Sequence, residues 1–357
     1  MSDTNSPKWY SALAALPGSF ENGSEGEDVL QHFQSGTDLL INVGLLVRNT
    51  NNCDREAVAS WSCDRCEKYL QPEEEFIVEA AQSSNRVTCF RYGKLWFVLF
   101  RGSRNLANWK SDFKIGVVPI PGDMLLAPVC DRNAECSKAT CHGGFFSVWT
   151  SLREQLLLEL RKRSVRPGDK SVKLFFSGHS MGGAVASVAA WNLCVLGFNV
   201  LGVLTFESPL VFNYQAALVY QSLLGTRTLR TTNQNDPVPH MPSHQHGYTH
   251  VGNELYMRAG EAHLCTFEEV RRCRNTMNRS DNCHCSSQDR FSFFTPYRHC
   301  LTEHFLTFNF CRCNGGSMSS GLAASASAKT ETRRRLTRIA NNFGTPITPA
   351  SVLSNSG

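Results

Sequence analysis

The chain has 357 residues, 41% of them hydrophobic, which is enough for one large folded domain or two smaller ones. Its net charge of +5 is modest, and part of it comes from the run Arg333–Arg335 near the C-terminus. The uniform basicity of nucleic-acid-binding proteins is therefore not indicated, and no nucleic-acid partner is expected. No apolar run approaches the roughly 20 residues of a membrane-spanning helix, so no transmembrane segment is predicted either.

The chain holds 15 cysteines, a number that favours disulfides and hence secretion or an endomembrane lumen. Against this, residues 1–20 show neither a charged start nor a continuous apolar stretch, so no convincing secretory signal is expected in the sequence as given. A zinc site is the alternative, but Cys63 and Cys66 form a CxxC without a second one at finger spacing. We therefore expect no metal. Cys89 and Cys194 lie in apolar segments and are predicted to be buried free thiols.

Hydrophobic patterns predict an alternation of helices and strands after a polar N-terminal arm, residues 1–35, that we expect to be flexible. The predicted helices span residues 39–47, 146–162, 181–194 and 215–224. The predicted strands span residues 86–92, 94–100, 172–176, 200–206 and 228–232. This order favours an α/β fold with a mainly parallel central sheet and helices on both faces. Residues 314–357 have low complexity and are expected to form a disordered tail.

The sequence GHSMG at residues 178–182 lies between a predicted buried strand and a predicted apolar helix. That setting is the one of a nucleophile elbow, in which a serine occupies a strained turn and small residues flank it. Gly178 and Gly182 supply the small residues, and Ser180 is the candidate nucleophile. The alternative is a glycine-rich turn in which Ser180 only caps the helix.

A serine nucleophile needs a histidine base and a carboxylate that orients it. Asp236 follows the predicted strand 228–232 and lies in the rigid sequence NDPVP, which makes it the candidate acid. An ordinary Asp-Pro turn residue would give the same pattern. Glu207 also ends a predicted strand and is the reserve candidate.

From about Asp38 to Cys313 the chain resembles class 3 lipases, the fungal triacylglycerol lipase family. Five segments carry this resemblance in the order in which the family has them: FRGS with NW and D at 100–112, HGGF at 142–145, GHSMGGA at 178–184, NQNDPVPHMP at 233–242 and GYTHVGNE at 247–254. The resemblance implies an α/β-hydrolase fold with a catalytic domain over residues 36–313. It also implies a cofactor-free esterase that acts on lipid esters at an oil–water or membrane interface, and we expect this esterase to be a monomer.

The resemblance further assigns roles to residues around the candidate nucleophile. Ser103 and Met181 would donate backbone N–H groups to the oxyanion. Leu106, Trp109 and Phe113 would be the apolar side chains of a lid, although these residues alone would read as a short surface helix.

The catalytic histidine of the family precedes a phenylalanine and a cysteine near the C-terminus, and His304 matches that position. Thr307 stands where the family has tyrosine, and His299 is the second candidate. Four other histidines cluster in a segment that we interpret as a polar loop rather than a metal site: His240, His244, His246 and His250.

Residues 205–213, TFESPLVFN, depart from the family's TFG.PRVGN. Glu207 and Phe212 replace glycines, which predicts a different backbone path in this turn. The resemblance also implies a Cys63–Cys66 disulfide and one between Cys53 and either Cys311 or Cys313.

The predicted activity is triacylglycerol hydrolysis through Ser180, His304 and Asp236. A phospholipase and a feruloyl-type esterase are alternatives within the enzymes. A lipid-binding lipase homologue without catalytic activity is the alternative of another class.

Overall fold

The computed structural model describes residues 36–62, 72–81, 83–103, 116–125, 134–233, 236–242, 246–258, 261–275 and 285–286. The predicted arm at residues 1–35 and the predicted tail at 314–357 lie outside these residues, and their character stays a prediction. In the part of the chain that is described, no helix is both long and apolar enough to cross a membrane.

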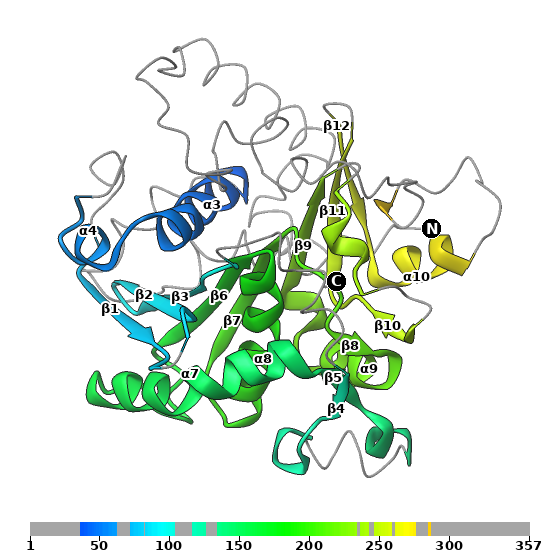
Figure 1. Ribbon diagram of the computed structural model, residues 1–357, viewed down its shortest axis with the longest axis horizontal. Helices are drawn as coiled ribbons and strands as arrows, with labels where there is room; N and C mark the ends of the chain where they lie inside the picture. Colours follow the sequence, from blue (N-terminus) through cyan, green and yellow to red (C-terminus); the bar gives the residue numbers. More distant parts are fainter. Residues whose placement is uncertain are drawn as a thin grey trace, which may run out of the picture.

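A twisted eight-stranded sheet forms the centre of the fold (Figure 1). In sheet order its strands are β1 (Glu74–Glu79), β2 (Arg86–Tyr92), β3 (Leu95–Phe100), β6 (Lys173–His179), β7 (Val200–Phe206), β9 (Thr228–Asn233), β11 (Asn253–Arg258) and β12 (Glu261–Cys265). The five strands from β3 to β11 run parallel, and the pairs at both edges are antiparallel. The predicted α/β architecture with a mainly parallel sheet is confirmed.

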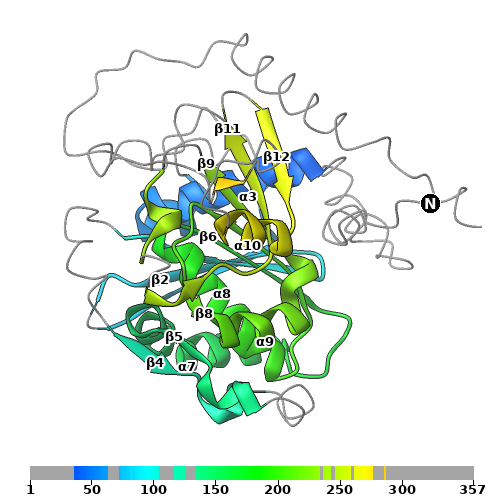
Figure 2. The ribbon, with the colours of Figure 1, turned by 90° about the vertical axis from the view of Figure 1, so that its right-hand side faces the viewer.

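Helices cover both faces of this sheet, as Figure 2 shows, with α3 on one face and α7, α8 and α9 on the other. The helices are α3 (Gly36–Asn52), α4 (Arg55–Ala59), α7 (Gly143–Lys162), α8 (Met181–Val195), α9 (Tyr214–Leu224) and α10 (Phe267–Asn275). A smaller sheet has the order β10 (Tyr248–Thr249), β8 (Phe212–Asn213), β5 (Thr140–His142) and β4 (Val117–Pro119). Short 3₁₀ helices span Gly122–Met124, Ala134–Lys138, Gly225–Arg227 and Val238–His240.

Helix α7 shows how the sequence pattern becomes packing. Its apolar residues recur at helical spacing, and Trp149, Leu152, Leu156 and Leu160 are all buried, while the opposite face is charged. Helix α8 is apolar on every side and is buried from Gly182 to Leu193. An all-apolar helix of this kind needs cover on all sides, and α7 and the sheet provide it.

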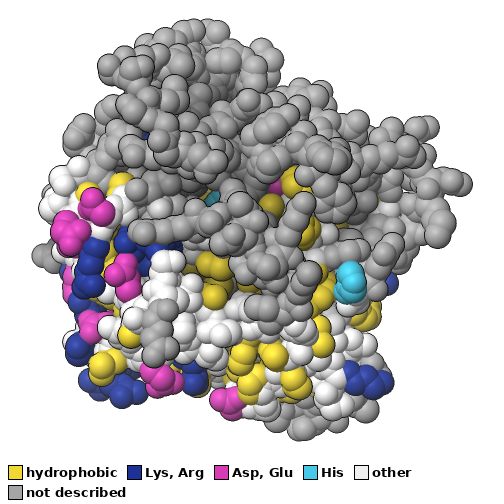
Figure 3. All heavy atoms as spheres, viewed as in Figure 1, with side chains coloured by type: hydrophobic (Ala, Val, Ile, Leu, Met, Phe, Trp, Pro, Cys, Tyr) yellow, Lys and Arg dark blue, Asp and Glu magenta, His cyan; other side chains and the backbone are white. Residues whose placement is uncertain are grey.

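Strand β1 is an edge strand, and charged side chains line it. Arg91 pairs with Glu73 and Glu74 at 2.5 and 3.2 Å, and Arg163, directly after α7, pairs with Glu74 at 2.7 Å. Figure 3 shows positively and negatively charged side chains gathered on the left of the molecule, the side on which Figure 1 places β1. Charges on an exposed edge oppose pairing with a second chain, which is the use we infer for them.

Backbone lies directly on backbone where β6 meets α8. A Cβ atom on Gly178 would lie 2.3 Å from the carbonyl carbon of Gly182, and one on Gly182 would lie 2.2 Å from the carbonyl oxygen of Phe100. Real Cβ atoms do not approach other atoms so closely, so both positions require glycine for space alone.

We predict that Gly178→Ala lowers the free energy of unfolding by about 3 kcal/mol or more, because the added methyl group must displace backbone rather than a side chain. Urea denaturation followed by circular dichroism measures this change. Gly122→Ala is the matched control, since a Cβ there meets nothing within 4 Å and should change stability by about 0.5 kcal/mol or less. Equal midpoints for the two variants would contradict the packing described here.

Candidate active site

Ser180 occupies a strained turn between β6 and α8. Its φ of 60° and ψ of −131° lie in a region that residues with side chains rarely adopt. Its N–H donates to the Phe206 carbonyl at 2.8 Å, which ties the turn to the neighbouring strand β7. The residue is 1% exposed. The turn thus has the local form of a nucleophile elbow.

The side chain of Ser180 does not cap helix α8, although the residue stands at the N-cap position. Among the described residues, its buried Oγ has no hydrogen-bond partner. The helix-capping alternative is therefore wrong. A buried hydroxyl without a partner is costly, and a reactive role is one reason for keeping it.

The end of β3 passes beside this turn. A Cβ on Gly102 would lie 2.9 Å from the His179 carbonyl oxygen and 3.6 Å from the Ser180 Cβ. The Gly102 N–H donates to Asn51 Oδ1 of α3 at 2.9 Å, which fixes the segment from the other side. The next residue, Ser103, donates from its Oγ to the Met181 sulfur at 3.3 Å. The two residues predicted to form the oxyanion hole are therefore in contact.

Asp236 lies beyond the end of β9 and is fully buried. Its N–H donates to the Asn233 carbonyl at 3.2 Å, and its Oδ1 accepts from the Val238 N–H at 2.9 Å. This second contact is the local hydrogen bond of an Asx turn, so Asp236 is a turn residue, as the alternative interpretation predicted. A residue that only forms a turn does not need to be buried, however. Burial of a carboxyl group costs free energy, so a second role for Asp236 is expected.

Glu207 follows β7 directly and is also fully buried, with its φ at 52°. That left-handed backbone is the one that glycine adopts most easily, so the glutamate occupies a conformation suited to the glycine of the family motif. Its Oε2 accepts from the Asn233 N–H at 3.0 Å. Burial raises the pKa of Glu207 well above its usual 4.5, and repulsion from Asp236 and a hydrogen bond with it raise the pKa further.

Strands β6, β7 and β9 are neighbours in the sheet and run parallel. Ser180, Glu207 and Asp236 follow their carboxyl ends in that order, so one edge of the sheet gathers them. His304 and His299 lie outside the described residues, as do the predicted lid residues Leu106, Trp109 and Phe113.

Two of the described histidines, His142 and His250, contact other parts of the fold. His142 accepts from the Gly144 N–H at 3.2 Å and stacks on Phe145, and burial lowers its pKa to about 4. The His250 Nε2 lies 2.6 Å from the Pro239 carbonyl oxygen, which links the GYTHVGNE segment to the loop of Asp236.

Comparison with known proteins adds a second line of evidence. Residues 97–246 match the family described as "Lipase (class 3)". This stretch of the chain is therefore similar to class 3 lipases. It contains Ser103, Ser180, Met181 and Asp236, the described members of the predicted site.

Relatives that match this part of the chain include fungal and plant proteins. A "Secreted mono- and diacylglycerol lipase A" of Penicillium cyclopium is 32% identical over 158 residues, which cover 44% of this chain and 46% of the relative. A "Phospholipase A1-II 1" of Oryza sativa subsp. indica is 28% identical over 179 residues, which cover 46% and 43%. The chain thus spans about half the length of these relatives. Lipase II of Rhizopus niveus shares the fold, with a TM-score of 0.56 and 20% identity over 74% of this chain and 92% of the other.

A buried polar cluster that the sequence pattern did not predict lies on the neighbouring strands β9 and β11. Arg230 on β9 and Glu254 on β11 are 3% and 0% exposed and pair at 3.4 Å. Glu254 also accepts from the N–H and the Oγ of Ser286 at 3.1 and 2.5 Å. The glutamate of the GYTHVGNE motif was the only signal in the sequence, and its partner Ser286 is 32 residues away.

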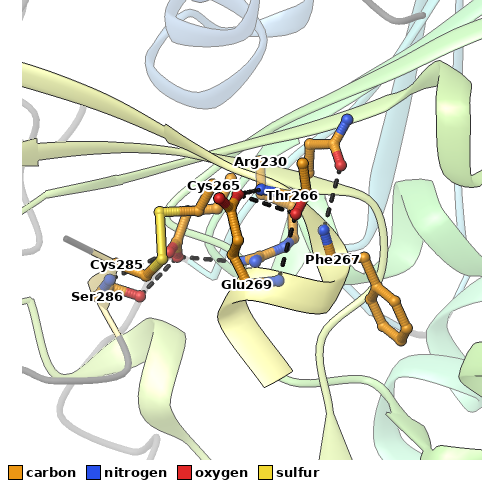
Figure 4. Close-up of a disulfide and its surroundings, with 9 residues drawn as sticks. Arg230, Cys265, Thr266, Phe267, Glu269, Cys285 and Ser286 are labelled. Atoms are coloured by element: carbon orange, nitrogen blue, oxygen red, sulfur yellow. Dashed lines mark hydrogen bonds and ion pairs between the residues drawn. A yellow bond between two sulfur atoms is a disulfide. The ribbon is translucent and has the colours of Figure 1, made fainter. Parts of the chain in front are cut away.

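A disulfide between Cys265 and Cys285 places Ser286 at this cluster, as Figure 4 shows. Among the described residues, Glu254 and these two cysteines are also the one group whose ligand atoms come close enough to hold a metal. The sulfur atoms are bonded to each other and Glu254 is hydrogen-bonded, so the group does not fit a metal site. Cys89 is a buried free thiol as predicted, whereas Cys194 is free but only partly buried.

We predict that Glu207→Gln makes stability less dependent on pH. A carboxyl group whose pKa is raised by folding contributes fully below its unfolded pKa, near 4.5, and loses that contribution as the pH rises towards the folded pKa. The loss can reach about 1.4 kcal/mol per pH unit, and an amide does not titrate.

Urea denaturation of the two proteins between pH 4.5 and 8 measures the difference, which should grow in favour of Glu207→Gln as the pH rises. Glu268→Gln is the control, because Glu268 is an exposed partner of Arg271 at the surface. Parallel pH profiles for the wild type and Glu207→Gln would show that the Glu207 carboxyl group is not neutral in the folded protein.

Proposed function

We propose that the protein is a serine hydrolase that cleaves the carboxylic esters of lipids. The strained turn at Ser180 is the main support for this proposal. Ser180 stands at the N-terminus of the buried helix α8, and its hydroxyl makes no capping hydrogen bond to that helix. The class 3 lipase match over residues 97–246 supports the same reaction. The burial of Asp236 at the same edge of the sheet supports it as the acid of a Ser-His-Asp triad.

In the proposed reaction, His304 takes the proton from Ser180 Oγ, which attacks the ester carbonyl carbon. The tetrahedral intermediate collapses when the carbon–oxygen bond to the alcohol breaks, and His304 returns its proton to the leaving alcohol. Water then attacks the acyl-enzyme, gives one proton to His304 and releases the fatty acid as Ser180 is protonated again. Asp236 orients the imidazole and stabilises its positive charge. This route uses no metal or organic cofactor.

The oxyanion of each intermediate would be held by the backbone N–H groups of Ser103 and Met181. The contact between their side chains supports the placement of both at one point beside Ser180. Met181 is the first residue of α8, where the helix dipole also favours negative charge. Loss of one such donor typically costs about 10²–10³ in rate.

We infer glycerolipid esters as the substrate class, with triacylglycerol as the leading candidate. Relatives named as a mono- and diacylglycerol lipase and as a phospholipase A1 support an acyl ester of glycerol, and the second keeps phospholipids as the alternative. Leu106, Trp109 and Phe113 would form an apolar lid that opens at a lipid surface. Rates on triacylglycerol emulsions, phospholipid vesicles, feruloyl esters and short soluble esters separate these substrates.

We also propose that the protein works outside the cytosol, in a secreted form or in an endomembrane lumen. The Cys265–Cys285 disulfide and the relative named as a secreted lipase support this location. A monomer remains the expected oligomeric state.

A fluorophosphonate reagent should label the wild-type protein, and Ser180→Ala should abolish both labelling and ester hydrolysis. We expect a loss of about 10⁴-fold or more, because the nucleophile itself is removed. Ser187→Ala is the control, since Ser187 lies buried on α8 and bonds to the Gly183 carbonyl. A folded wild-type protein that is never labelled would favour the non-catalytic lipid-binding alternative.

His304→Ala should reduce hydrolysis by about 10⁴-fold or more, whereas His299→Ala should leave most of it. The wild-type rate should fall as the pH decreases through the pKa of a histidine, about 6.5 when unperturbed, because the base must be neutral. Rates from pH 4 to 9 on a soluble ester measure both effects. Activity that stays flat down to about pH 4 would contradict a histidine base, and the opposite ranking of the two variants would assign the role to His299.

A further inference from the structure

Glu207 is the least expected residue in the site. It adopts the left-handed backbone that favours glycine, and it does so with a side chain that is completely buried. A glycine would avoid both the backbone strain and the burial of a carboxyl group. Strain that persists at the edge of a candidate active site points to a use for the side chain.

The backbone around Glu207 holds it against Asp236. The Glu207 N–H donates to the Thr231 carbonyl at 3.0 Å, which ties the end of β7 to β9. The same residue accepts from the Asn233 N–H at 3.0 Å through Oε2, and the Asn233 carbonyl accepts from the Asp236 N–H at 3.2 Å. Asn233 therefore connects the two acids through its own peptide groups.

Electrostatic repulsion determines which of the two carboxyl groups, Glu207 or Asp236, holds a proton. Two adjacent buried carboxyl groups cannot both ionise at low cost, so one of them retains a proton. Glu254 adds repulsion at Glu207, and the buried Arg230 pairs with Glu254. The Val238 N–H donates to Asp236 at 2.9 Å, so one oxygen of that carboxyl group already accepts a hydrogen bond. Burial and repulsion raise the pKa of Glu207, so the proton belongs to Glu207.

We propose that Glu207 is a positioning residue: its protonated carboxyl group donates a hydrogen bond to Asp236 and orients that carboxylate towards the catalytic histidine. The inference rests on the proposed function, in which Asp236 is the acid of the triad. The Val238 N–H donates to one oxygen of Asp236, and Glu207 would be a second donor. These contacts would fix the Asp236 carboxylate independently of the catalytic histidine. A pre-positioned acid of this kind limits the motion of the imidazole and so supports the rate.

Two substitutions at this position separate positioning from mere space filling. Glu207→Gln keeps both contacts, since its amide oxygen accepts from Asn233 and its NH₂ donates to Asp236. Glu207→Gly removes the donor and relieves the left-handed backbone, while it leaves a cavity and takes the acceptor away from the Asn233 N–H; the Tm therefore checks that the variant folds. Ser164→Gly is the matched control, because Ser164 has a φ of 61° at an exposed position after α7.

The measurements are kcat and KM on a short soluble ester from pH 5 to 9, together with Tm for each protein. We expect Glu207→Gly to lower kcat about tenfold to a hundredfold with little change in KM. Its acidic limb should move to higher pH, because a carboxylate that has lost a donor stabilises the imidazolium more strongly. The kcat of Glu207→Gln should stay within about threefold of the wild-type value. The kcat of Ser164→Gly should equal the wild-type value.

Three results would overturn the proposal. Glu207→Gly with wild-type kcat and an unshifted pH profile would make the side chain a space filler. Glu207→Gln as impaired as Glu207→Gly would show that donation to Asp236 is not the role. Asp236→Asn with near wild-type activity would make Glu207 the triad acid itself. A wild type that neither hydrolyses esters nor reacts with a fluorophosphonate would instead overturn the proposed function, and this inference with it.

Discussion

Backbone packs directly against backbone where β6 turns into α8, and the arrangement of the site depends on that contact. The absence of side chains at Gly178 and Gly182 lets the strand, the helix and the end of β3 approach one another. The approach holds Ser180 in its strained conformation and brings the segment of Ser103 alongside. A methyl group at either glycine would separate these elements, so the geometry of the turn is set by steric limits rather than by attractive contacts.

The parallel sheet turns this local constraint into a site. Neighbouring parallel strands end at the same edge of a sheet. The residues that follow β6, β7 and β9 therefore come together, although Ser180 and Asp236 are far apart in the chain. A buried acid follows two of the three strands, and two buried acids cost free energy unless one carboxyl group stays neutral. The site therefore combines backbone strain at Ser180 and Glu207 with a buried negative charge. Such concentrations of strain and charge are typical of functional sites.

Much of this arrangement could be predicted from the sequence. The strands and helices with strong periodicity were predicted within a few residues, and the strand Val200–Phe206 matches its predicted bounds. Those elements are long, apolar and bounded by turn residues, which is where pattern reasoning is most reliable. The predicted strands 172–176 and 228–232 also placed Ser180 and Asp236 shortly after strand ends.

Other features depend on tertiary context that a sequence does not display. Strand β1 was missed because two charged residues, Glu74 and Glu75, lie partly buried at a sheet edge and dilute its apolar pattern. The strands β11 and β12 were missed for a related reason. Glu254 on β11 is a charged residue inside the fold, and its buried partners Arg230 and Ser286 offset the cost of burying it. The substitution at Glu207 predicted an altered backbone path. In the structure, the residue takes the left-handed conformation that glycine favours, and its altered chemistry lies in the side chain.

The measurement that tests the account most directly is a crystal structure of the full chain after reaction with a fluorophosphonate. We expect the phosphorus atom to be bonded to Ser180 Oγ and its oxygen to accept from the N–H groups of Ser103 and Met181. His304 should lie between Ser180 and Asp236, with one ring nitrogen on each side. A phosphonyl group on any other residue, or no histidine between Ser180 and Asp236, would contradict the account.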